Sequence, residues 1–304
     1  MNESFYRQLD QIYASSPQSV EEFLKKTLDS CRRDQDLNSV ITVRNELGSL
    51  YRGQACYEDS LCCFQDALEK LEQLGQKDSI PYLTTLMNRA GTLRLANRAG
   101  DAVEDFLYVL SLLHQTPEDV RCLRASALNN LGLAYQSLNR LEEAEDCLTK
   151  ALEIIRTLPG MTAEAASSGN NLAALCLKQG RLEDAARWLE PAIAYYRSPE
   201  GRQDPHYPSA YATLAALRCR QDRLEEALEC YDRSAAGTER FFGQNPQYAA
   251  ACYDAALIAF VLKREDCALR MEEAVSLWER LQGSASPKAG KMRRLLDRLQ
   301  EDMP

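Results

Sequence analysis

The stretch NNLGLAYQSLNRLEEAEDCLTKAL, residues 129–152, decides the fold class because its pattern recurs along the chain. Gapless matches lie at residues 86–106, 169–189 and 211–231, the same frame fits residues 44–64, and residues 252–272 fit more loosely. Self-similarity with a period near 42 residues is typical of repeat proteins, in which each unit packs on its neighbours. The sequence therefore predicts one repeating architecture.

Small residues define the register of the repeat. One slot, early in each copy, is occupied by Gly48, Ala90, Gly132, Ala173, Ala215 and Ala256, which are 41 or 42 residues apart. A second small slot follows twelve residues later, at Ser60, Ala102, Ala144, Ala185, Ala227 and Ala268. We expect two elements to approach closely at these slots in every copy.

The two elements of each unit are predicted to be α-helices. In the first half, Leu128, Leu131 and Tyr135 recur at helical intervals. A polar turn at Asn139 follows, and the second half then opens with acidic residues such as Glu142, which favour a helix N-terminus. The prediction is an all-α, right-handed superhelical solenoid of antiparallel helix pairs.

The 304 residues divide into three parts under this prediction. Residues 39–283 hold six repeats of about 42 residues. Residues 1–38, with apparent helices at 5–13 and 20–33, and residues 284–304 fit the frame poorly, and we interpret them as N-terminal and C-terminal helical caps.

Composition narrows the possible functions. The chain has 36 Lys and Arg against 45 Asp and Glu, a net charge of −9, so neither nucleic acid nor a membrane is an expected partner. We see no secretory signal and no apolar run of the length that a membrane helix needs, and the eleven cysteines are an odd number. These features predict a cytoplasmic protein with reduced cysteines.

Motifs for chemistry are missing from the sequence. It has two histidines, no cysteine or histidine pairs at zinc spacing, no glycine-rich phosphate-binding motif and no Gly-x-Ser-x-Gly. We therefore expect no metal, no cofactor and no enzymatic activity.

The residue pattern of one unit resembles that of a known family. Leu131, Gly132, Tyr135, Ala144 and Ala151 resemble the tetratricopeptide repeat, and the 42-residue variant with paired asparagines is similar to that of kinesin light chains. The resemblance covers about residues 39–283. It is looser in repeat two, which has Arg89 at a position where the family prefers Leu, and in repeat six, which has Ala255 there and Glu272 where an aromatic residue or Leu is usual.

The resemblance implies that the first helices line a concave groove for an extended peptide or a partner helix. We call the residues expected on this face the first-helix stripe: Asn45, Ser49, Arg52, Asn88, Arg94, Asn129, Asn130, Gln136, Asn170, Asn171, Lys178 and Arg220. Asparagine amides can donate to and accept from a peptide main chain. The cations would favour acidic ligands. Alternatively, the asparagines satisfy their own helices and the cations only complement helix C-termini.

Three other patterns receive structural interpretations. An arginine in each turn after the first, at Arg98, Arg140, Arg181, Arg223 and Arg264, is expected to be turn consensus, with phosphate or carboxylate binding as the alternative. Cys63, Cys147 and Cys230 share a slot and are expected to pack in the core. The clamp by which some family members hold chaperone tails is matched only at Asn88, so that activity is not expected.

The sequence thus predicts a non-enzymatic module that binds a protein or peptide. We expect the module to be a monomer or a weak dimer. Two alternatives stay open. One is a peptide-sensing receptor that acts on a separate effector chain, and the other is an assembly scaffold that uses its caps or its convex face.

Overall fold

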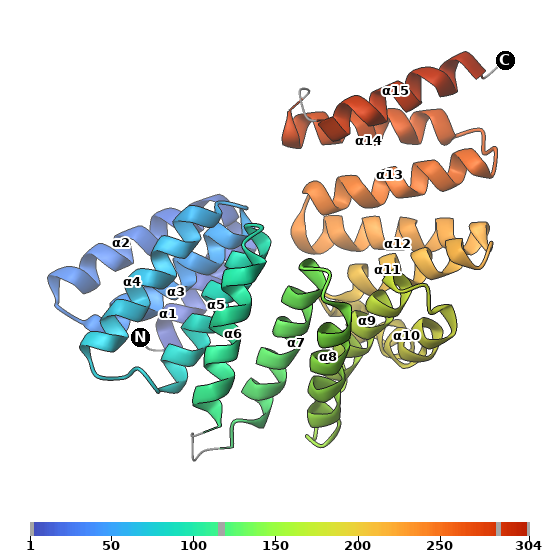
Figure 1. Ribbon diagram of the computed structural model, residues 1–304. Helices are drawn as coiled ribbons and strands as arrows, with labels where there is room; N and C mark the ends of the chain where they lie inside the picture. Colours follow the sequence, from blue (N-terminus) through green and yellow to red (C-terminus); the bar gives the residue numbers. More distant parts are fainter. Residues whose placement is uncertain (1–2, 115–118, 284–286, 303–304) are drawn as a thin grey trace. The chain divides into compact units, whose positions relative to one another are not determined.

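The computed structural model describes residues 3–114, 119–283 and 287–302, and every regular element within them is helical (Figure 1). The prediction of an all-α chain is confirmed. Two short 3-10 helices, η1 (Pro17–Ser19) and η2 (Gly201–Gln203), accompany the α-helices. The α-helices are α1 (Glu3–Ser15), α2 (Val20–Arg33), α3 (Leu37–Gly53), α4 (Tyr57–Gln73), α5 (Ile80–Leu95), α6 (Ala99–Leu113), α7 (Arg121–Ser137), α8 (Leu141–Arg156), α9 (Thr162–Lys178), α10 (Leu182–Arg197), α11 (Tyr207–Arg220), α12 (Leu224–Phe242), α13 (Pro246–Val261), α14 (Cys267–Gln282) and α15 (Pro287–Asp302).

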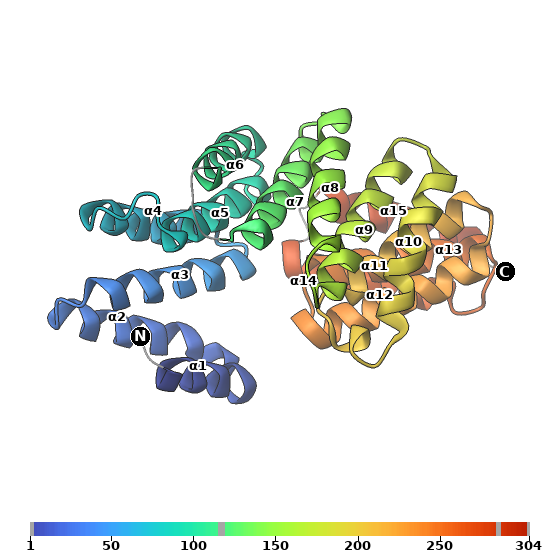
Figure 2. The same ribbon diagram turned by 90° about the horizontal axis from the view of Figure 1, so that it is seen from below.

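The chain forms two compact units, residues 1–154 and 155–304, whose boundary falls inside α8. In the first unit, α3 pairs with α4 and α5 with α6 (Figure 2). In the second unit, α9 pairs with α10, α11 with α12 and α13 with α14. Five of the six predicted helix pairs are therefore present, and α1, α2 and α15 lie where helices were predicted at the two ends of the chain. The division into caps and repeats stays a prediction.

The small slots are where paired helices meet. All six residues of the first slot are buried. A Cβ atom placed on Gly48 would lie 2.7 Å from the ring of Phe64, and one on Gly132 would lie 2.7 Å from Leu148 Cγ. In the second slot only Ala268 is half-buried, in the repeat that fits the frame most loosely. The predicted close approach is confirmed.

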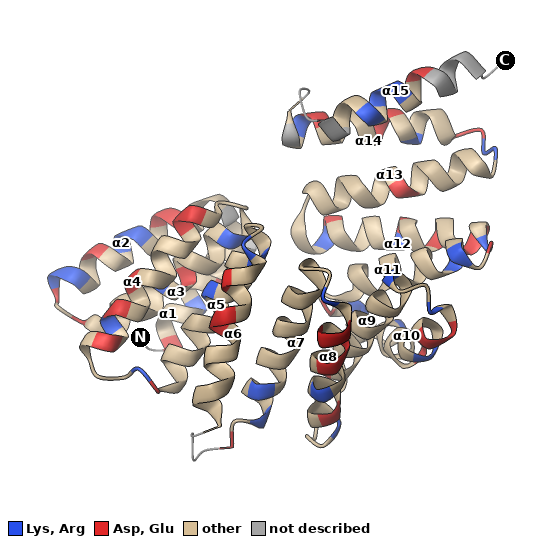
Figure 3. Ribbon diagram, in the orientation of Figure 1, with Lys and Arg blue, Asp and Glu red and all other residues tan. Residues whose placement is uncertain are grey.

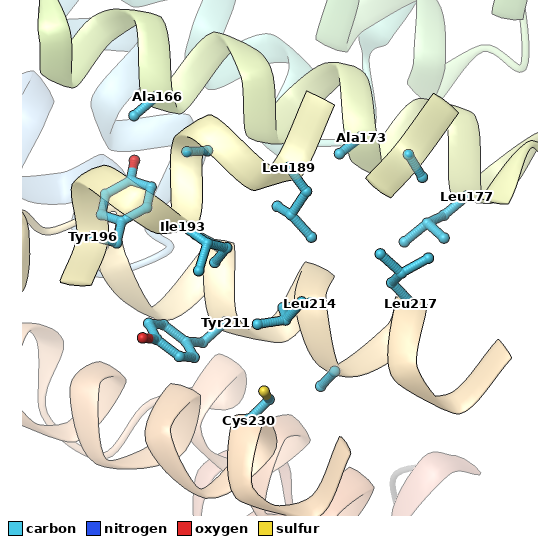
Figure 4. Close-up of a cluster of buried hydrophobic side chains, with 14 of the residues drawn as sticks. Ala166, Ala173, Leu177, Leu189, Ile193, Tyr196, Tyr211, Leu214, Leu217 and Cys230 are labelled. Carbon is cyan, nitrogen blue, oxygen red and sulfur yellow. The ribbon is translucent and has the colours of Figure 1, made fainter. Parts of the chain in front are cut away.

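The core of each unit is built by side chains of successive helices. In the first unit, Phe106 and Leu83 are fully buried within α6 and α5. Figure 4 shows the central cluster of the second unit, in which Ile193 of α10 lies near Tyr211 and Leu214 of α11. The predicted packing role of the shared cysteines is confirmed, since Cys63, Cys147 and Cys230 are buried. Burial raises the pKa of Cys147 and of Cys230 to about 11, which disfavours the reactive thiolate.

Charge is distributed unevenly over the helices. Figure 3 shows Asp and Glu gathered on second helices such as α8, whereas α7 and α13 carry few acidic residues. Among the described residues, no helix has the length and apolarity that crossing a bilayer requires.

Candidate peptide-binding surface

The first-helix stripe is divided between the two units. Eight of its residues lie on α3, α5 and α7 in the first unit, and four lie on α9 and α11 in the second. Most are half-buried, Lys178 and Arg220 are exposed, and Asn170 is buried. The most direct contacts within the stripe are in the first unit, between α3 and α5.

Arg52 reaches from the last turn of α3 to the backbone of α5. Its Nη1 atom lies 3.5 Å from the carbonyl oxygen of Asn88, which is long for a hydrogen bond. The guanidinium passes beside Gly91, where an added Cβ atom would lie 3.5 Å from Nη1 and would have no other neighbour within 4 Å. Burial lowers the pKa of Arg52. The side chain is therefore partly desolvated while its donors are poorly satisfied.

Arg94, in the last turn of α5, has the same difficulty. Its Nε atom is buried and has no hydrogen-bond partner. Burial lowers the pKa of Arg94, and the positive charge of Arg52 lowers it further, while Tyr57 acts in the opposite direction. Within the described residues neither arginine forms an ion pair. We call Arg52 and Arg94 the arginine pair.

Two other half-buried arginines of the same unit, Arg44 and Arg89, have carboxylate partners, while Arg124 of α7 donates to the carbonyl oxygen of Leu113 at 3.2 Å. The Nε atom of Arg44 lies 2.6 Å from an oxygen of Asp66, and its side chain is 18% exposed. Arg89, 25% exposed, donates to both carboxylate oxygens of Asp105, at 2.9 and 2.7 Å. The arginine pair differs from both because its charge is not compensated.

Arg89 also explains a departure from the repeat pattern. Besides the bond to Asp105 of α6, its Nη1 atom donates to Gln65 Oε1 of α4 at 2.6 Å. A polar link joining three helices thus stands where a buried Leu was expected. The sequence analysis did not predict this link. The presence of Asp105 on the next helix could have indicated a partner for Arg89.

The asparagines of the stripe have several different surroundings. Asn45 and Asn130 each donate from Nδ2 to the carbonyl four residues earlier, to Ile41 at 3.1 Å and to Ser126 at 2.9 Å. These bonds fit the alternative in which asparagine satisfies its own helix, although each amide keeps a second N–H. Asn170 is 4% exposed and donates to Ser209 Oγ of α11 at 3.3 Å. It therefore joins two first helices inside the second unit.

Four of the five arginines in the turns are paired within their own repeats, and no such pair is seen for Arg264 among the described residues. These four precede a second helix and form an ion pair with the carboxylate three residues later. These pairs are Arg98–Asp101 at 2.7 Å, Arg140–Glu143, Arg181–Asp184 at 2.7 Å and Arg223–Glu226 at 2.5 Å. The structural interpretation of these four arginines is confirmed.

Residues 123–198 match the model of the tetratricopeptide repeat family. These residues therefore form tetratricopeptide repeats, and the chain is similar to kinesin light chain-related proteins. Kinesin light chain-related protein 3 of Arabidopsis thaliana is 23% identical over 260 residues, which are 83% of this chain and 38% of that protein. This tetratricopeptide chain thus spans well under two thirds of that relative.

Two solved structures show the same tetratricopeptide fold. A tetratricopeptide repeat protein from Parabacteroides merdae is 20% identical with a TM-score of 0.58, covering 97% of this chain and 100% of that one. The apo form of the quorum sensor NprR from B. thuringiensis is 15% identical with a TM-score of 0.61, covering 98% of this chain and 81% of that one. At these identities the likeness concerns the fold.

Proposed function

We propose that this chain is a non-enzymatic interaction module that captures an extended peptide or a partner helix on the first-helix stripe. A tetratricopeptide array is a fold suited to protein–protein interaction, because stacked pairs present long surfaces. The single observation that supports this surface is the arginine pair, two half-buried cations on first helices without a carboxylate partner. A ligand with acidic groups would supply the missing charge.

The proposed binding mode combines main-chain and charge recognition. The side-chain amides of half-buried asparagines, such as Asn130 and Asn171, would bond to the ligand backbone. Each such bond contributes about 1 kcal/mol net, whereas a bond to a charged group contributes about 1.5–3 kcal/mol. The arginine pair would therefore select acidic ligands, and the asparagines would hold the bound peptide in an extended conformation.

The test compares Asn130→Ala/Asn171→Ala with the wild type on an array of acidic and neutral peptides. We expect the double variant to lose about tenfold in peptide affinity, which corresponds to the loss of one or two net hydrogen bonds. Helicity and melting temperature should stay unchanged. Gln73→Ala, which removes an exposed amide from the second helix α4, is the control and should bind like the wild type. Equal peptide affinity of the double variant and the wild type would contradict the proposal.

A further inference from the structure

The arginine pair places two positive charges close together in a partly buried position. Arg52 and Arg94 come from different helices, α3 and α5, and are close enough for the charge of one to act on the other. Bringing two like charges together in a partly desolvated place is unfavourable. The same unit provides carboxylates for Arg44 and Arg89. The pair therefore differs from these two arginines in having no carboxylate partner among the described residues.

The surroundings of the pair favour an oxyanion. Among the described residues, the guanidinium of Arg52 has one long hydrogen bond, to the carbonyl oxygen of Asn88, and the Nε–H of Arg94 has no hydrogen-bond partner. Planar guanidinium groups bind phosphate or carboxylate oxygens in a bidentate manner. Gly91 has no side chain beside Arg52, and an added Cβ there would touch nothing else within 4 Å, so the backbone of α5 leaves space at this point.

Charge balance separates the possible oxyanions. One carboxylate carries a single negative charge, which would leave one of the two half-buried cations uncompensated. A phosphomonoester carries about −1.5 to −2 at pH 7 and has three acceptor oxygens. It can neutralise both guanidinium groups and accept from both.

We propose that Arg52 and Arg94 form a binding site for a doubly charged oxyanion, the phosphomonoester of a phosphorylated side chain. The proposal rests on the proposed function in one respect, namely that the phosphate is carried by a peptide bound on the first-helix stripe. Free inorganic phosphate has the same chemistry, and the experiment distinguishes the two sources.

The experiment uses the full chain at constant low ionic strength. Calorimetric titrations with inorganic phosphate, O-phosphoserine and sulfate are performed at pH 5.5 and 7.5. Peptides from the array that bind are then compared in phosphorylated, unphosphorylated and Ser→Asp forms. The variants are Arg52→Gln and Arg94→Gln. The matched control is Arg33→Gln, which removes an exposed arginine from the last turn of α2 and so makes the same charge change at the same kind of helix end.

We expect the phosphorylated peptide to bind about tenfold or more tightly than its other two forms, and this gain to disappear in both pair variants. The control should keep it. Binding of phosphate groups should weaken at pH 5.5, since their second pKa is near 6, whereas sulfate binding should not change. Both pair variants should fold, because each removes one of two repelling charges, and a melting curve checks this.

Two results would overturn the inference. The first is an equal affinity for phosphorylated and unphosphorylated peptide in the wild type. The second is a loss in the control equal to that in the pair variants, which would indicate diffuse attraction. Tight binding of inorganic phosphate with no gain for the phosphopeptide would assign the site to the free ion and contradict the peptide source. If the pair variants fail to change phosphopeptide binding while Asn130→Ala/Asn171→Ala weakens it, the inference fails and the proposed function stands.

Discussion

At the scale of single residues, the same amino-acid type has different roles according to its neighbours. Arg98 precedes a helix and is paired with Asp101, while Arg94, four residues earlier, has a buried Nε atom without a partner. Sequence spacing places both near the end of a hairpin but does not show which one has a carboxylate within reach. Arg98 is explained by its ion pair with Asp101, whereas the helix dipole favours a cation at Arg94, in the last turn of α5, but provides no partner for its buried Nε atom.

The hairpin turns contain a residue whose backbone is left-handed, and this gives a prediction for Ala55. Its φ is 61°, while Gly180 has φ 79° in the turn of repeat four. A left-handed conformation costs a residue with a Cβ atom about 1 kcal/mol, and glycine avoids that cost. We expect Ala55→Gly to raise the free energy of unfolding by about 1 kcal/mol in urea titrations.

The reciprocal change is the control for this prediction. Gly180→Ala should lower the free energy of unfolding by a similar amount, about 1 kcal/mol, because it introduces the Cβ atom into the same kind of turn. Two changes of the same sign would contradict the explanation.

At the scale of helices, the small slots determine how closely α7 and α8 pack. A Cβ atom on Gly132 would lie 2.7 Å from Leu148 Cγ and 3.1 Å from the carbonyl oxygen of Ala144. We expect Gly132→Ala to lower the free energy of unfolding by about 1–3 kcal/mol, as overpacking of a core does. Gly100→Ala is the matched control, because a Cβ there meets nothing within 4 Å and should stabilise α6 by up to about 1 kcal/mol. Thermal and urea unfolding measure both.

The stability of the cluster to which α1 and α3 both contribute is predicted to depend on pH. Burial raises the pKa of Glu46 on α3 above its ordinary value of 4.5, and the charge of Asp10 on α1 raises it further. Glu46 in turn raises the pKa of Tyr6 and Tyr13, for which burial is the larger cause. The folded state therefore holds the Glu46 proton more tightly than the unfolded state, so this group favours folding at low pH and loses that contribution as pH rises.

Glu46→Gln tests this sign. The variant should unfold at higher urea concentration than the wild type at pH 7.5, and the difference should shrink as the pH falls toward the ordinary pKa of the carboxyl group. Other carboxylates contribute equally to both proteins, so their effect cancels in the difference between the two free energies of unfolding. A constant difference at all pH values would show that Glu46 does not titrate in the window above its ordinary pKa.

At the scale of the molecule, the two compact units provide a test between function classes. Small-angle scattering with and without a binding peptide from the array measures the radius of gyration of the whole chain. A module that binds the peptide on the first-helix stripe without switching should keep its radius of gyration. The alternative, a peptide-sensing receptor, requires a ligand that favours one of two conformations and therefore predicts compaction.

The sequence alone determined the all-helical class, the close approach of paired helices at the small slots and the resemblance to the tetratricopeptide repeat. It could do so because helical periodicity, small slots such as Gly132, and turn residues are local signals repeated every 41 or 42 residues. It also named Arg52 and Arg94 as stripe residues, but as two of several similar cations.

The tertiary structure decided which of the candidate residues are buried and which of them have a partner on another helix. It placed Asn170 inside the second unit against Ser209 and paired Arg89 with Asp105, but among the described residues it gave Arg52 and Arg94 no carboxylate partner. These outcomes depend on distances between helices and on loss of solvent. Burial and the field of neighbouring charges are properties of the packed chain, and no spacing in the sequence encodes them directly.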